Sequence, residues 1–366
     1  MQKVYANITN VTEAFSECAA KKVFLVRDRA FEQFTIAHEI INMPVPYVVF
    51  DGFTSNPVYE DVASGVKLFD ESGCDFILAV GGGSTIDVAK CIKLYCRMDH
   101  TRSYLSQDYV KNDFPIMAIP TTAGTGSEST RIAVIYYRGE KQSISHDAIL
   151  PAYVLFEPGV LITLPLYQRK CTMLDALCQA IESWWSVAST DESKALSKEA
   201  IEIIVANMRG YLDNDPHGNR EMMRAANLSG HAIDIAHTTA VHAMSYKLTI
   251  LYGIAHGHAV ALCLPSMWRY MVAHMERCTD VRGAMYVSEM FGEIAAALGQ
   301  TNVHDAIAWF ESLLADLRIG RPELKCEPDI PSLAATVNPA RLRNNPVYMD
   351  HEVADSLYRL ILEANP

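Results

Sequence analysis

Short apolar runs that alternate with helix-like segments dominate the first part of the chain. These runs lie at residues 22–26, 46–50, 75–80, 115–119, 132–137 and 152–156. Such alternation favours a parallel β-sheet covered by helices. From about residue 166 onward, Ala-, Leu-, Met- and Glu-rich segments with few β-branched runs are typical of helices. The sequence therefore predicts an α/β domain over residues 1–160 and an all-helical domain over residues 161–366, with the hinge between Glu157 and Pro165.

Three consecutive glycines follow one of these predicted strands. Gly81, Gly82 and Gly83 come after the run 75–80 and lead into a helix-like segment at residues 88–95. Glycines let the backbone approach a ligand closely, and the start of a helix offers free N–H groups to a phosphate. The spacing matches neither the Gly-x-Gly-x-x-Gly fingerprint nor a Walker loop. Taken alone, the glycines are also consistent with an ordinary tight turn.

A second polar loop follows the next predicted strand. Residues 120–128 read Pro-Thr-Thr-Ala-Gly-Thr-Gly-Ser-Glu, directly after the apolar run 115–119. Hydroxyl side chains and glycines in one loop can surround a polar ligand with hydroxyl and backbone donors. A polar surface turn with a helix cap is the alternative. Because both loops follow strands in the same half of the chain, we expect them to form a dinucleotide site.

The helical half contains side chains with the spacing of a metal site. Asp175 and Gln179 are four residues apart in an apolar, helix-forming run, so both lie on one face, one turn apart. His242 and His256 are fourteen residues apart and can share an ion only if the chain breaks between them, for which Gly253 is the expected position. A histidine on an apolar helix is often simply buried, but a buried carboxylate needs a partner. The spacing alone leaves both interpretations open.

Together these motifs closely resemble the iron-dependent (group III) alcohol dehydrogenase family. The resemblance covers nearly the whole chain, from Phe50-Asp51 and Asn56-Pro57 to a tail motif at residues 337–346. It implies an N-terminal nucleotide-binding α/β domain with a parallel sheet, an all-helical C-terminal domain, and a divalent metal in the cleft beside the nicotinamide ring. The implied metal ligands are Asp175, Gln179, His242 and His256, and the implied cofactor-binding residues are Asp28, Asn56, Gly81, Gly82, Gly83, Ser84, Asp87, Thr121, Thr122, Thr125, Ser127 and Lys141.

Two positions depart from the family pattern. The usual second metal ligand is a histidine, but this chain has Gln179, and an amide oxygen is a weaker ligand than imidazole for iron or zinc. The family also usually has a histidine four residues after His242, where this chain has Tyr246. We therefore expect the product alkoxide to take its proton from Tyr246, His258 or a bound water. Fe²⁺ or Zn²⁺ is the expected metal, with Mn²⁺ as a further option.

Several segments resemble one branch of the family, whose members reduce phosphonoacetaldehyde to 2-hydroxyethylphosphonate. These segments are Gln179 and residues 136–151, 245–247 and 256–258. A phosphonate group needs fixed donors and cations. The candidates are Arg131, Lys141, His146 and Lys247, although each is also consistent with a solvated charge.

Other functions stay open at this point. Sulfoacetaldehyde is nearly isosteric with phosphonoacetaldehyde, so a sulfoacetaldehyde reductase is an alternative, and so is a generalist short-chain alcohol dehydrogenase. A dehydroquinate synthase-like reaction on the same fold is disfavoured by the loop at residues 120–128. A nucleotide-binding pseudoenzyme without metal is disfavoured by the presence of Asp175, His242 and His256.

The choice of dinucleotide depends on the end of the strand predicted at residues 22–26. Asp28 follows that strand and can accept hydrogen bonds from the adenosine ribose while repelling a 2′-phosphate, which favours NAD(H) over NADP(H). Arg27 and Arg29 flank it and are able to bind such a phosphate instead. A helix cap before Ala30 is the structural alternative for Asp28.

Composition and charge limit the kinds of partner that we expect for this chain. The 366 residues carry a net charge of −12, which argues against nucleic acid and anionic membranes. The start of the chain lacks the apolar segment of a secretory signal, and no run approaches the ~18 apolar residues of a membrane span. The cysteines are scattered without a zinc-ribbon spacing, so we expect reduced thiols in a cytoplasmic protein. The resemblance adds the expectation of a homodimer that acts on a small anionic aldehyde.

Overall fold

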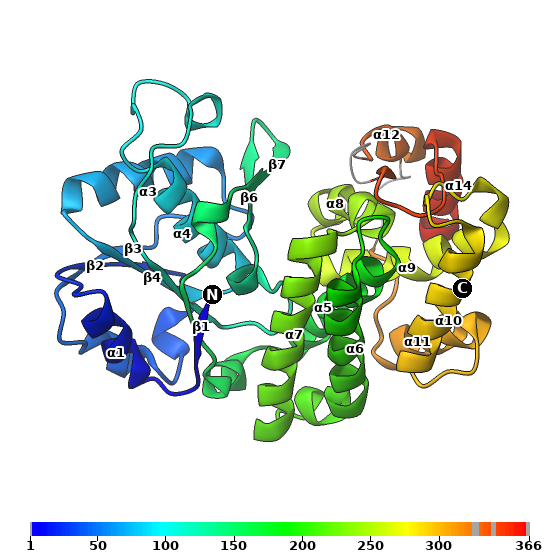
Figure 1. The fold of residues 1–366 in the computed structure, drawn as a ribbon, viewed down its shortest axis with the longest axis horizontal. Coiled ribbons are helices and arrows are strands. Elements are labelled where there is room, and N and C mark those ends of the chain that lie inside the picture. The colour runs from blue at the N-terminus through cyan, green and yellow to red at the C-terminus, as the bar shows by residue number, and fades with distance from the viewer. Residues whose placement is uncertain (1, 324–328, 338–341, 364–366) are drawn as a thin grey trace. The chain divides into compact units, whose positions relative to one another are not determined.

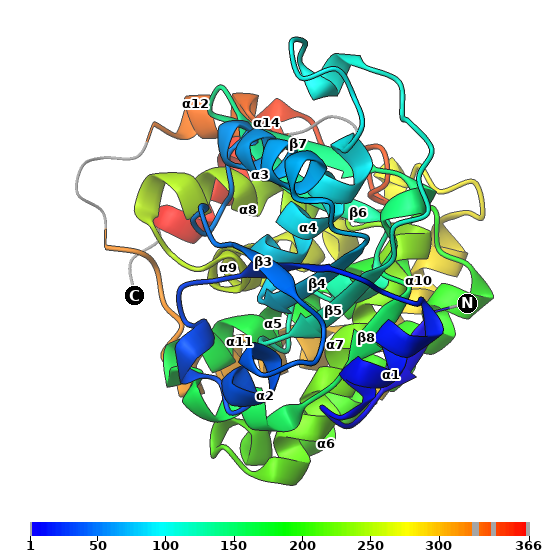
Figure 2. The same ribbon diagram turned by 90° about the vertical axis from the view of Figure 1, so that its left-hand side faces the viewer.

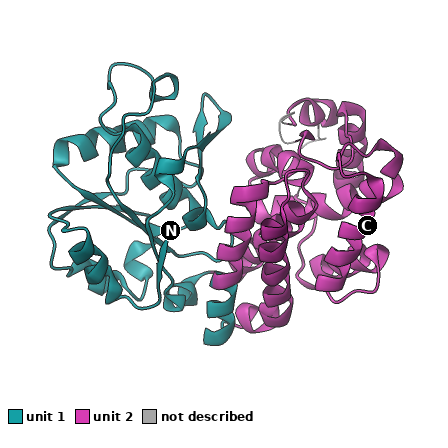
Figure 3. Ribbon diagram, viewed as in Figure 1, with its two compact units in different colours: residues 1–164, 214–223 teal, residues 165–213, 224–366 magenta. Residues whose placement is uncertain are grey.

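The computed structural model of the chain describes residues 2–323, 329–337 and 342–363. These residues form two compact units (Figure 3). The first comprises Met1–Leu164 with Asn214–Met223, and the second comprises Pro165–Asp213 with Arg224–Pro366. Residues 338–341 of the tail motif lie outside the described part of the chain.

A parallel β-sheet forms the centre of the first unit (Figure 1). Among the described residues it has six strands in the order β1-β8-β5-β4-β2-β3. The strands are β1 (Lys3–Tyr5), β2 (Val23–Arg27), β3 (Tyr47–Phe50), β4 (Phe76–Gly81), β5 (Ile116–Pro120) and β8 (Tyr153–Leu155). Five of the six strands expected from the apolar runs join this sheet, and β4 and β5 are buried along their whole length, as a sheet covered on both faces requires.

Helices cover both faces of this sheet (Figures 1 and 2). Helices α3 (Tyr59–Ser72) and α4 (Gly83–Tyr95) lie over one face, and α1 (Asn10–Glu17) and α2 (Ala37–Ile41) lie over the other. Aromatic contacts mark the two layers, since Phe69 of α3 packs edge-on against Phe24 and Phe15 of α1 packs edge-on against Phe76. The 3₁₀ helices are η1 (Phe31–Gln33), η2 (Tyr104–Ser106), η3 (Ser127–Ser129), η4 (Asp147–Ile149), η5 (Pro158–Thr163) and η6 (Met275–Arg277), the last in the second unit.

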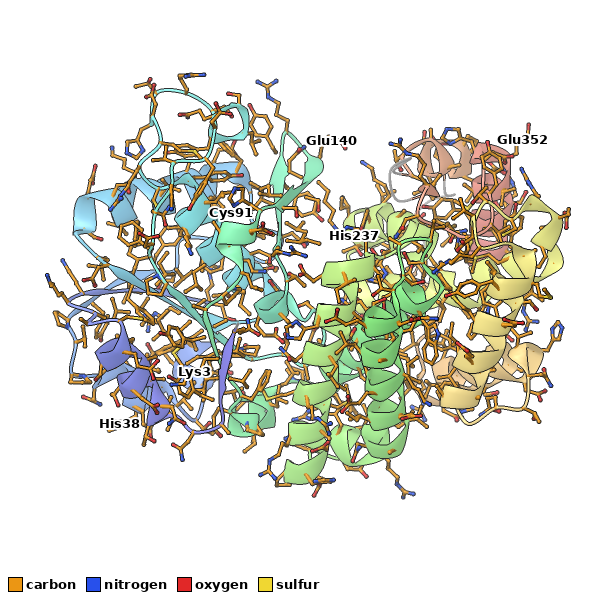
Figure 4. All side chains as sticks on the ribbon, viewed as in Figure 1. Lys3, His38, Cys91, Glu140, His237 and Glu352 are labelled. Carbon is orange, nitrogen blue, oxygen red and sulfur yellow. The ribbon has the colours of Figure 1, made fainter. Side chains whose placement is uncertain are left out.

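The sixth expected strand, at residues 132–137, does not join the parallel sheet. It forms β6 (Ile132–Tyr137) of an antiparallel hairpin with β7 (Glu140–Ser145). The turn between them is tight because Arg138 and Gly139 both have positive φ, +54° and +78°. Strand β7 was not predicted because its polar sequence lacks an apolar run, and Glu140 at the turn is exposed (Figure 4).

The elements of the second unit are helical. They are α5 (Leu166–Trp185), α6 (Asp191–Leu212), α8 (Ala240–Tyr252), α9 (His256–Ala273), α10 (Ala284–Ala297), α11 (Val303–Asp316), α12 (Ile330–Ala335) and α14 (His351–Leu362), with α7 (Pro216–Ala236) running from the first unit into the second. Helix α5 is buried along most of its length. Trp185 at its end packs against Trp268 and Phe291 and so belongs to the core of this unit. In the described part of the chain, no helix is both long and apolar enough to span a membrane.

Candidate functional site

The two polar loops predicted from the sequence lie side by side. They follow the neighbouring parallel strands β4 and β5, whose ends are in register at Gly81 and Pro120. The backbone N–H of Thr121 donates a 3.0 Å hydrogen bond to the carbonyl oxygen of Gly81. The first residues of both loops are therefore tied together at the carboxyl edge of the sheet, where ligands of α/β proteins bind.

The glycines allow this close packing. A Cβ atom at Gly83 would lie 2.8 Å from Oγ1 of Thr125, and one at Gly81 would lie 2.3 Å from Oγ1 of Thr85. A Cβ atom at Gly82 would meet the side chain of Thr122 at 3.4 Å. Helix α4 begins at Gly83, so its unsatisfied N–H groups open beside the hydroxyls of the second loop. This arrangement favours a phosphate-binding role for the glycines over that of an ordinary tight turn.

Asp28 lies at the point where the sheet changes direction. The chain leaves β2 toward β3 on one side and leaves β4 toward β5 on the other, so the ends of β2 and β4 flank the crevice typical of nucleotide sites. Burial raises the pKa of the Asp28 carboxyl, while hydrogen bonds from the backbone amides of Ala30 and Gly82 oppose that rise. The bond to Ala30 also fulfils the turn-capping role considered for this residue.

The residues around Asp28 differ in accessibility. Arg27 is engaged by Glu32 at 2.8 Å and by the face of Phe31, whereas Arg29 is exposed. Asn56 is exposed with a left-handed φ of +58°, and its backbone N–H donates to Oγ of Ser84 at the start of α4. Asn56 and Ser84 thus lie together at the glycine turn.

Three of the expected cofactor residues lie deeper. Oδ1 of Asp87 accepts a 2.6 Å hydrogen bond from Oγ of Ser127, and its Oδ2 accepts one from the backbone N–H of Val134 at 3.0 Å. Ser127 is buried and Asp87 is half-buried. Lys141 on β7 is close enough for its charge to lower the pKa of Asp87, against a larger rise from burial. These groups join the second loop, α4 and the hairpin.

The predicted metal ligands converge in the second unit. Oδ1 of Asp175 on α5 lies 3.4 Å from Nε2 of His242 on α8 and 3.8 Å from Nε2 of His256 on α9. Among the described residues, these three form a group whose ligand atoms all lie within 4.8 Å of one another. The predicted break at Gly253 is confirmed, because α8 ends at Tyr252, Gly253 has φ +64°, and α9 begins at His256.

A glycine also permits the approach of α9 to α5. A Cβ atom at Gly257 would lie 1.9 Å from the backbone oxygen of Cys171 and 2.9 Å from Cβ of Asp175. No side chain fits into that space. Gly257 therefore lets the N-terminus of α9 bring His256 to Asp175.

The sequence analysis missed one residue of this site, Glu182. Its buried carboxylate accepts hydrogen bonds from Nδ1 of His242 and from both the backbone N–H and Oγ1 of Thr239, the latter at 2.9 and 2.6 Å. Glu182 lies seven residues after Asp175 on the same face of α5, so the spacing carried a signal. A carboxylate that holds one ring nitrogen directs the other toward a metal.

Sequence models of one protein family match both parts of the chain. The model of iron-containing alcohol dehydrogenases matches residues 4–158, and the model of the C-terminal part of Fe-containing alcohol dehydrogenases matches residues 170–362. The chain belongs to the iron-containing alcohol dehydrogenase family. It is an oxidoreductase of the alcohol dehydrogenase type.

Individual relatives of this alcohol dehydrogenase agree with the family. The chain is 32% identical over 331 residues to a phosphonoacetaldehyde reductase of Streptomyces viridochromogenes, an alignment that covers 86% of this chain and 82% of that protein. The crystal structure of a 1,3-propanediol oxidoreductase aligns with a TM-score of 0.88 at 27% identity and covers 99% of this chain and 98% of that one. A sulfoacetaldehyde reductase from Bifidobacterium kashiwanohense in complex with NAD⁺ has the same fold, with a TM-score of 0.88, 24% identity, and coverage of 100% and 98%. These relatives support aldehyde reduction in general.

The side chains of the metal site fit a divalent ion. No described residue makes a hydrogen bond to the buried Nε2 of His242, which faces Oδ1 of Asp175. Burial lowers the pKa of His242, but the carboxylates of Glu182 and Asp175 outweigh this effect and raise the pKa to about 10. Asp175 and His242 would hold a divalent cation here, and the imidazole would then be in the neutral form that binds metals.

Gln179 lies one helical turn after Asp175 on the buried side of α5. Its Oε1 accepts a 3.0 Å hydrogen bond from Oγ of Ser229, and the side chain is almost fully buried. An amide oxygen has a second lone pair. Ser229 therefore orients Gln179 and leaves it able to act as a neutral fourth ligand.

The two residues expected to handle the proton lie in different surroundings. The ring of Tyr246 on α8 stacks on His256, with centroids 5.9 Å apart and planes 22° apart, which places it beside the metal ligands. His258 is buried, and both of its ring nitrogens are bonded, Nε2 to the carbonyl oxygen of Gly320 at 2.6 Å and Nδ1 to the hydroxyl of Tyr167 at 2.9 Å. Through these bonds, His258 holds the first turn of α9 against Tyr167 and Gly320.

Burial lowers the pKa of His258, which favours the neutral form of its imidazole. The carbonyl oxygen of Gly320 accepts a hydrogen bond from Nε2–H, and Nδ1 in turn accepts a hydrogen bond from the hydroxyl of Tyr167. The same Tyr167 hydroxyl accepts the backbone N–H of Ala255, immediately before His256. A proton relay through His258 would break this arrangement.

Three of the four candidate anion-binding residues, Arg131, Lys141 and His146, lie in or beside the β6–β7 hairpin, and Lys247 lies in the second unit. Arg131 and His146 meet at the base of the hairpin, where the backbone N–H of His146 donates to the carbonyl oxygen of Arg131 at 3.0 Å. Arg131 forms an ion pair with the exposed Asp147 at 3.0 Å. Nδ1 of His146 accepts a hydrogen bond from the N–H of Ala148, so Nε2 is the ring nitrogen left to donate to a ligand. Lys247 follows Tyr246 on α8, in the second unit, and is half-buried.

Proposed function

We propose that this alcohol dehydrogenase uses NADH to reduce a small anionic aldehyde, with phosphonoacetaldehyde as the preferred substrate and 2-hydroxyethylphosphonate as the product. The observation that carries the proposal is the group formed by the buried Asp175 and His242 and the half-buried His256, in a chain 32% identical to a phosphonoacetaldehyde reductase. The glycine turn and hydroxyl loop of the first unit support a dinucleotide as the co-substrate. Asp28 at the end of β2 favours NADH over NADPH.

The metal set is Asp175, Gln179, His242 and His256, which suits Fe²⁺ or Zn²⁺ and also admits Mn²⁺. When bound, the metal supplies Lewis-acid polarisation of the aldehyde oxygen, and NADH supplies the hydride. Asp175 contributes the negative charge of the set, and Glu182 keeps His242 in the tautomer that presents Nε2. Gln179 adds a neutral oxygen, so the set carries one formal charge less than the ion.

The protein itself provides the proton. The ring of Tyr246 stacks on His256, so its hydroxyl is the proton donor that we assign. Its proton passes to the oxygen of the former aldehyde, and solvent restores it. Tyrosine is a poor acid with an ordinary pKa near ~10, but a neighbouring cation favours its ionised form and so makes the transfer easier.

Two cations, Lys247 and Arg131, are separate candidates for binding an anionic head group. Lys247 lies next to Tyr246 on α8 and is the candidate on the second unit. Arg131 is the candidate on the first unit, and its exposed ion pair with Asp147 is weak enough, at ~0–1 kcal/mol, to be exchanged for a phosphonate. Each is tested separately because each implies its own contribution to substrate affinity.

The experiment measures oxidation of NADH and NADPH by metal-loaded enzyme with phosphonoacetaldehyde, sulfoacetaldehyde and uncharged butyraldehyde. The proposal expects the highest kcat/KM with phosphonoacetaldehyde and NADH. Lys247→Gln and Arg131→Gln should raise KM for the anionic aldehydes by ~10-fold or more and leave KM for butyraldehyde unchanged. Equal rates with butyraldehyde in the wild type would overturn the anionic substrate.

A generalist dehydrogenase is the second candidate. It is favoured by the 27% identity to the 1,3-propanediol oxidoreductase, whose substrate is uncharged. In that case neither charge-removing variant changes the ratio of kcat/KM between charged and uncharged aldehydes. A sulfoacetaldehyde reductase would instead show the same dependence on Lys247 and Arg131 with the order of the two anionic substrates reversed.

A further inference from the structure

Lys90 on α4 is a lysine with no exposed surface at all. It is 0% exposed, and so is the next residue, Cys91. Figure 4 labels Cys91 in the first unit. Burying an ammonium group costs several kcal/mol unless hydrogen bonds and charges compensate it. The surroundings of Lys90 therefore have to supply that compensation.

Four oxygen atoms surround the ammonium group. Nζ of Lys90 donates to Oγ of Ser127 at 3.1 Å, to Oγ1 of Thr130 at 3.1 Å, to the carbonyl oxygen of Ile132 at 2.8 Å, and to the carbonyl oxygen of Ser127. An ammonium group has three protons, so every donor is used. Asp87, one turn earlier on α4, lies close enough for the two charges to interact, and it accepts the hydroxyl proton of Ser127.

These bonds join three separate segments of the first unit. Lys90 and Asp87 belong to α4, whose N-terminus is the glycine turn. Ser127 and Thr130 end the hydroxyl loop, and Ile132 starts β6. The hydrogen bonds of the ammonium group therefore connect the helix that begins at the glycine turn to the end of the hydroxyl loop.

We infer that Lys90 is a positioning residue that holds the glycine turn and the hydroxyl loop at the separation a dinucleotide phosphate requires. The inference rests on the proposed use of NADH. Because Lys90 is fully buried, it does not touch the cofactor, and any effect it has on NADH affinity acts through the two loops. A cofactor bound between N–H groups and hydroxyls is sensitive to misplacement by about 1 Å.

The test compares NADH binding, thermal stability and metal binding in Lys90→Met, Thr130→Val and Lys93→Met. Lys93 lies one turn later on α4, is half-buried, and serves as the matched control for losing a lysine from this helix. Thr130→Val removes one acceptor of Lys90 with little change in side-chain shape, so it stays informative if Lys90→Met does not fold. NADH affinity is measured by fluorescence titration, which needs neither aldehyde nor turnover.

Lys90→Met should weaken NADH binding and raise its KM by ~10-fold or more, and Thr130→Val by roughly threefold, with kcat at saturating NADH nearly unchanged. Metal affinity of the second unit and the behaviour of Lys93→Met should match the wild type. Unchanged NADH affinity in folded Lys90→Met, or in Thr130→Val when Lys90→Met does not fold, would overturn the inference. Absence of activity on phosphonoacetaldehyde would overturn the proposed substrate and leave the titration result standing.

Discussion

Glu182 accepts a hydrogen bond from Nδ1 of His242 from a position with no solvent exposure. The bond leaves Nε2 of the same ring directed at Oδ1 of Asp175. Thr239 donates two further hydrogen bonds to the Glu182 carboxylate and so fixes its orientation. One buried acid therefore decides both the tautomer and the direction of a proposed metal ligand, although it contributes no ligand atom itself.

We expect Glu182→Gln to weaken metal binding by ~10–100-fold. Glutamine keeps the size of the side chain but removes the charge that makes the His242 imidazole a stronger ligand. Metal affinity is measured by competition with a chromophoric chelator, and NADH titration of the same protein serves as the control because the dinucleotide loops belong to the other unit. Wild-type metal affinity in this variant would show that the Glu182–His242 bond serves only the packing of α5 and α8.

Glu182 also shows which kind of site residue could not be predicted from the sequence. Asp175, Gln179, His242 and His256 were predicted as metal ligands from their spacing together with the resemblance to the family, and Gly253 supplied the chain break that the spacing required. The spacing of Glu182 from Asp175 fits the same helix face. However, a carboxylate that supports a ligand has no spacing rule of its own, and only the structure shows which ring nitrogen it meets.

The fold, too, could be predicted from the sequence only in part. Apolar runs predicted the buried strands because burial on both faces selects such residues, whereas β7 was missed because its side chains are polar. His258 was a candidate proton donor in the sequence. Its partners Tyr167 and Gly320 lie 91 and 62 residues away, a distance at which no local pattern carries information. Lys90 is similar, since its four oxygen acceptors come from a loop about forty residues later.

Gly257→Ala tests whether the approach of α9 to α5 sets the metal site. The added Cβ would lie 1.9 Å from the backbone oxygen of Cys171, so α9 has to move by about 1 Å and carries His256 with it. We expect kcat and metal affinity to fall by ~100-fold. Gly292→Ala on α10 is the control, because nothing lies within 4 Å of its Cβ position and alanine favours a helix. Full activity of Gly257→Ala would contradict the argument.

Gln179→His should strengthen metal binding. Imidazole is a better ligand than an amide oxygen for Fe²⁺ and Zn²⁺, and we expect a gain of about tenfold, equivalent to ~1.4 kcal/mol. Gln179→Ala provides the comparison, since it removes the fourth ligand and should lower the affinity. Isothermal titration of the metal-free protein gives all three values. If histidine binds metal no better than alanine, Gln179 is not directed at the ion and its task is the hydrogen bond to Ser229.

Tyr246→Phe addresses the proton donor. The ring stacks on His256, and phenylalanine preserves this contact while it removes the hydroxyl. We expect kcat to fall by ~100-fold, within the usual range for loss of a general acid, with metal and NADH affinities unchanged. His258→Asn is the matching variant for the other candidate. It should lower the thermal stability of the protein and leave the pH profile of kcat nearly unchanged. A normal kcat in Tyr246→Phe would assign the proton to bound water.

The preference for NADH over NADPH should depend on pH through Asp28. Burial raises the pKa of this carboxyl, so on acidification it loses its charge at a pH above the range of an ordinary aspartate, near 3.8. A neutral Asp28 no longer repels a 2′-phosphate, so the ratio of NADPH KM to NADH KM should fall as the pH decreases, by about tenfold (~1.4 kcal/mol).

Unfolding in acid through Asp28 would not explain this change in the KM ratio, because protonation of Asp28 stabilises the folded protein. A carboxyl whose pKa is higher in the folded state than in the unfolded state costs stability while ionised, and protonation relieves that cost. Steady-state kinetics with both dinucleotides between pH 5 and 8, alongside Asp28→Asn, separate the effects. The variant should show a low ratio at every pH, because asparagine carries no charge to lose. A ratio that changes with pH to the same extent in Asp28→Asn would assign the dependence to another group, such as the 2′-phosphate itself.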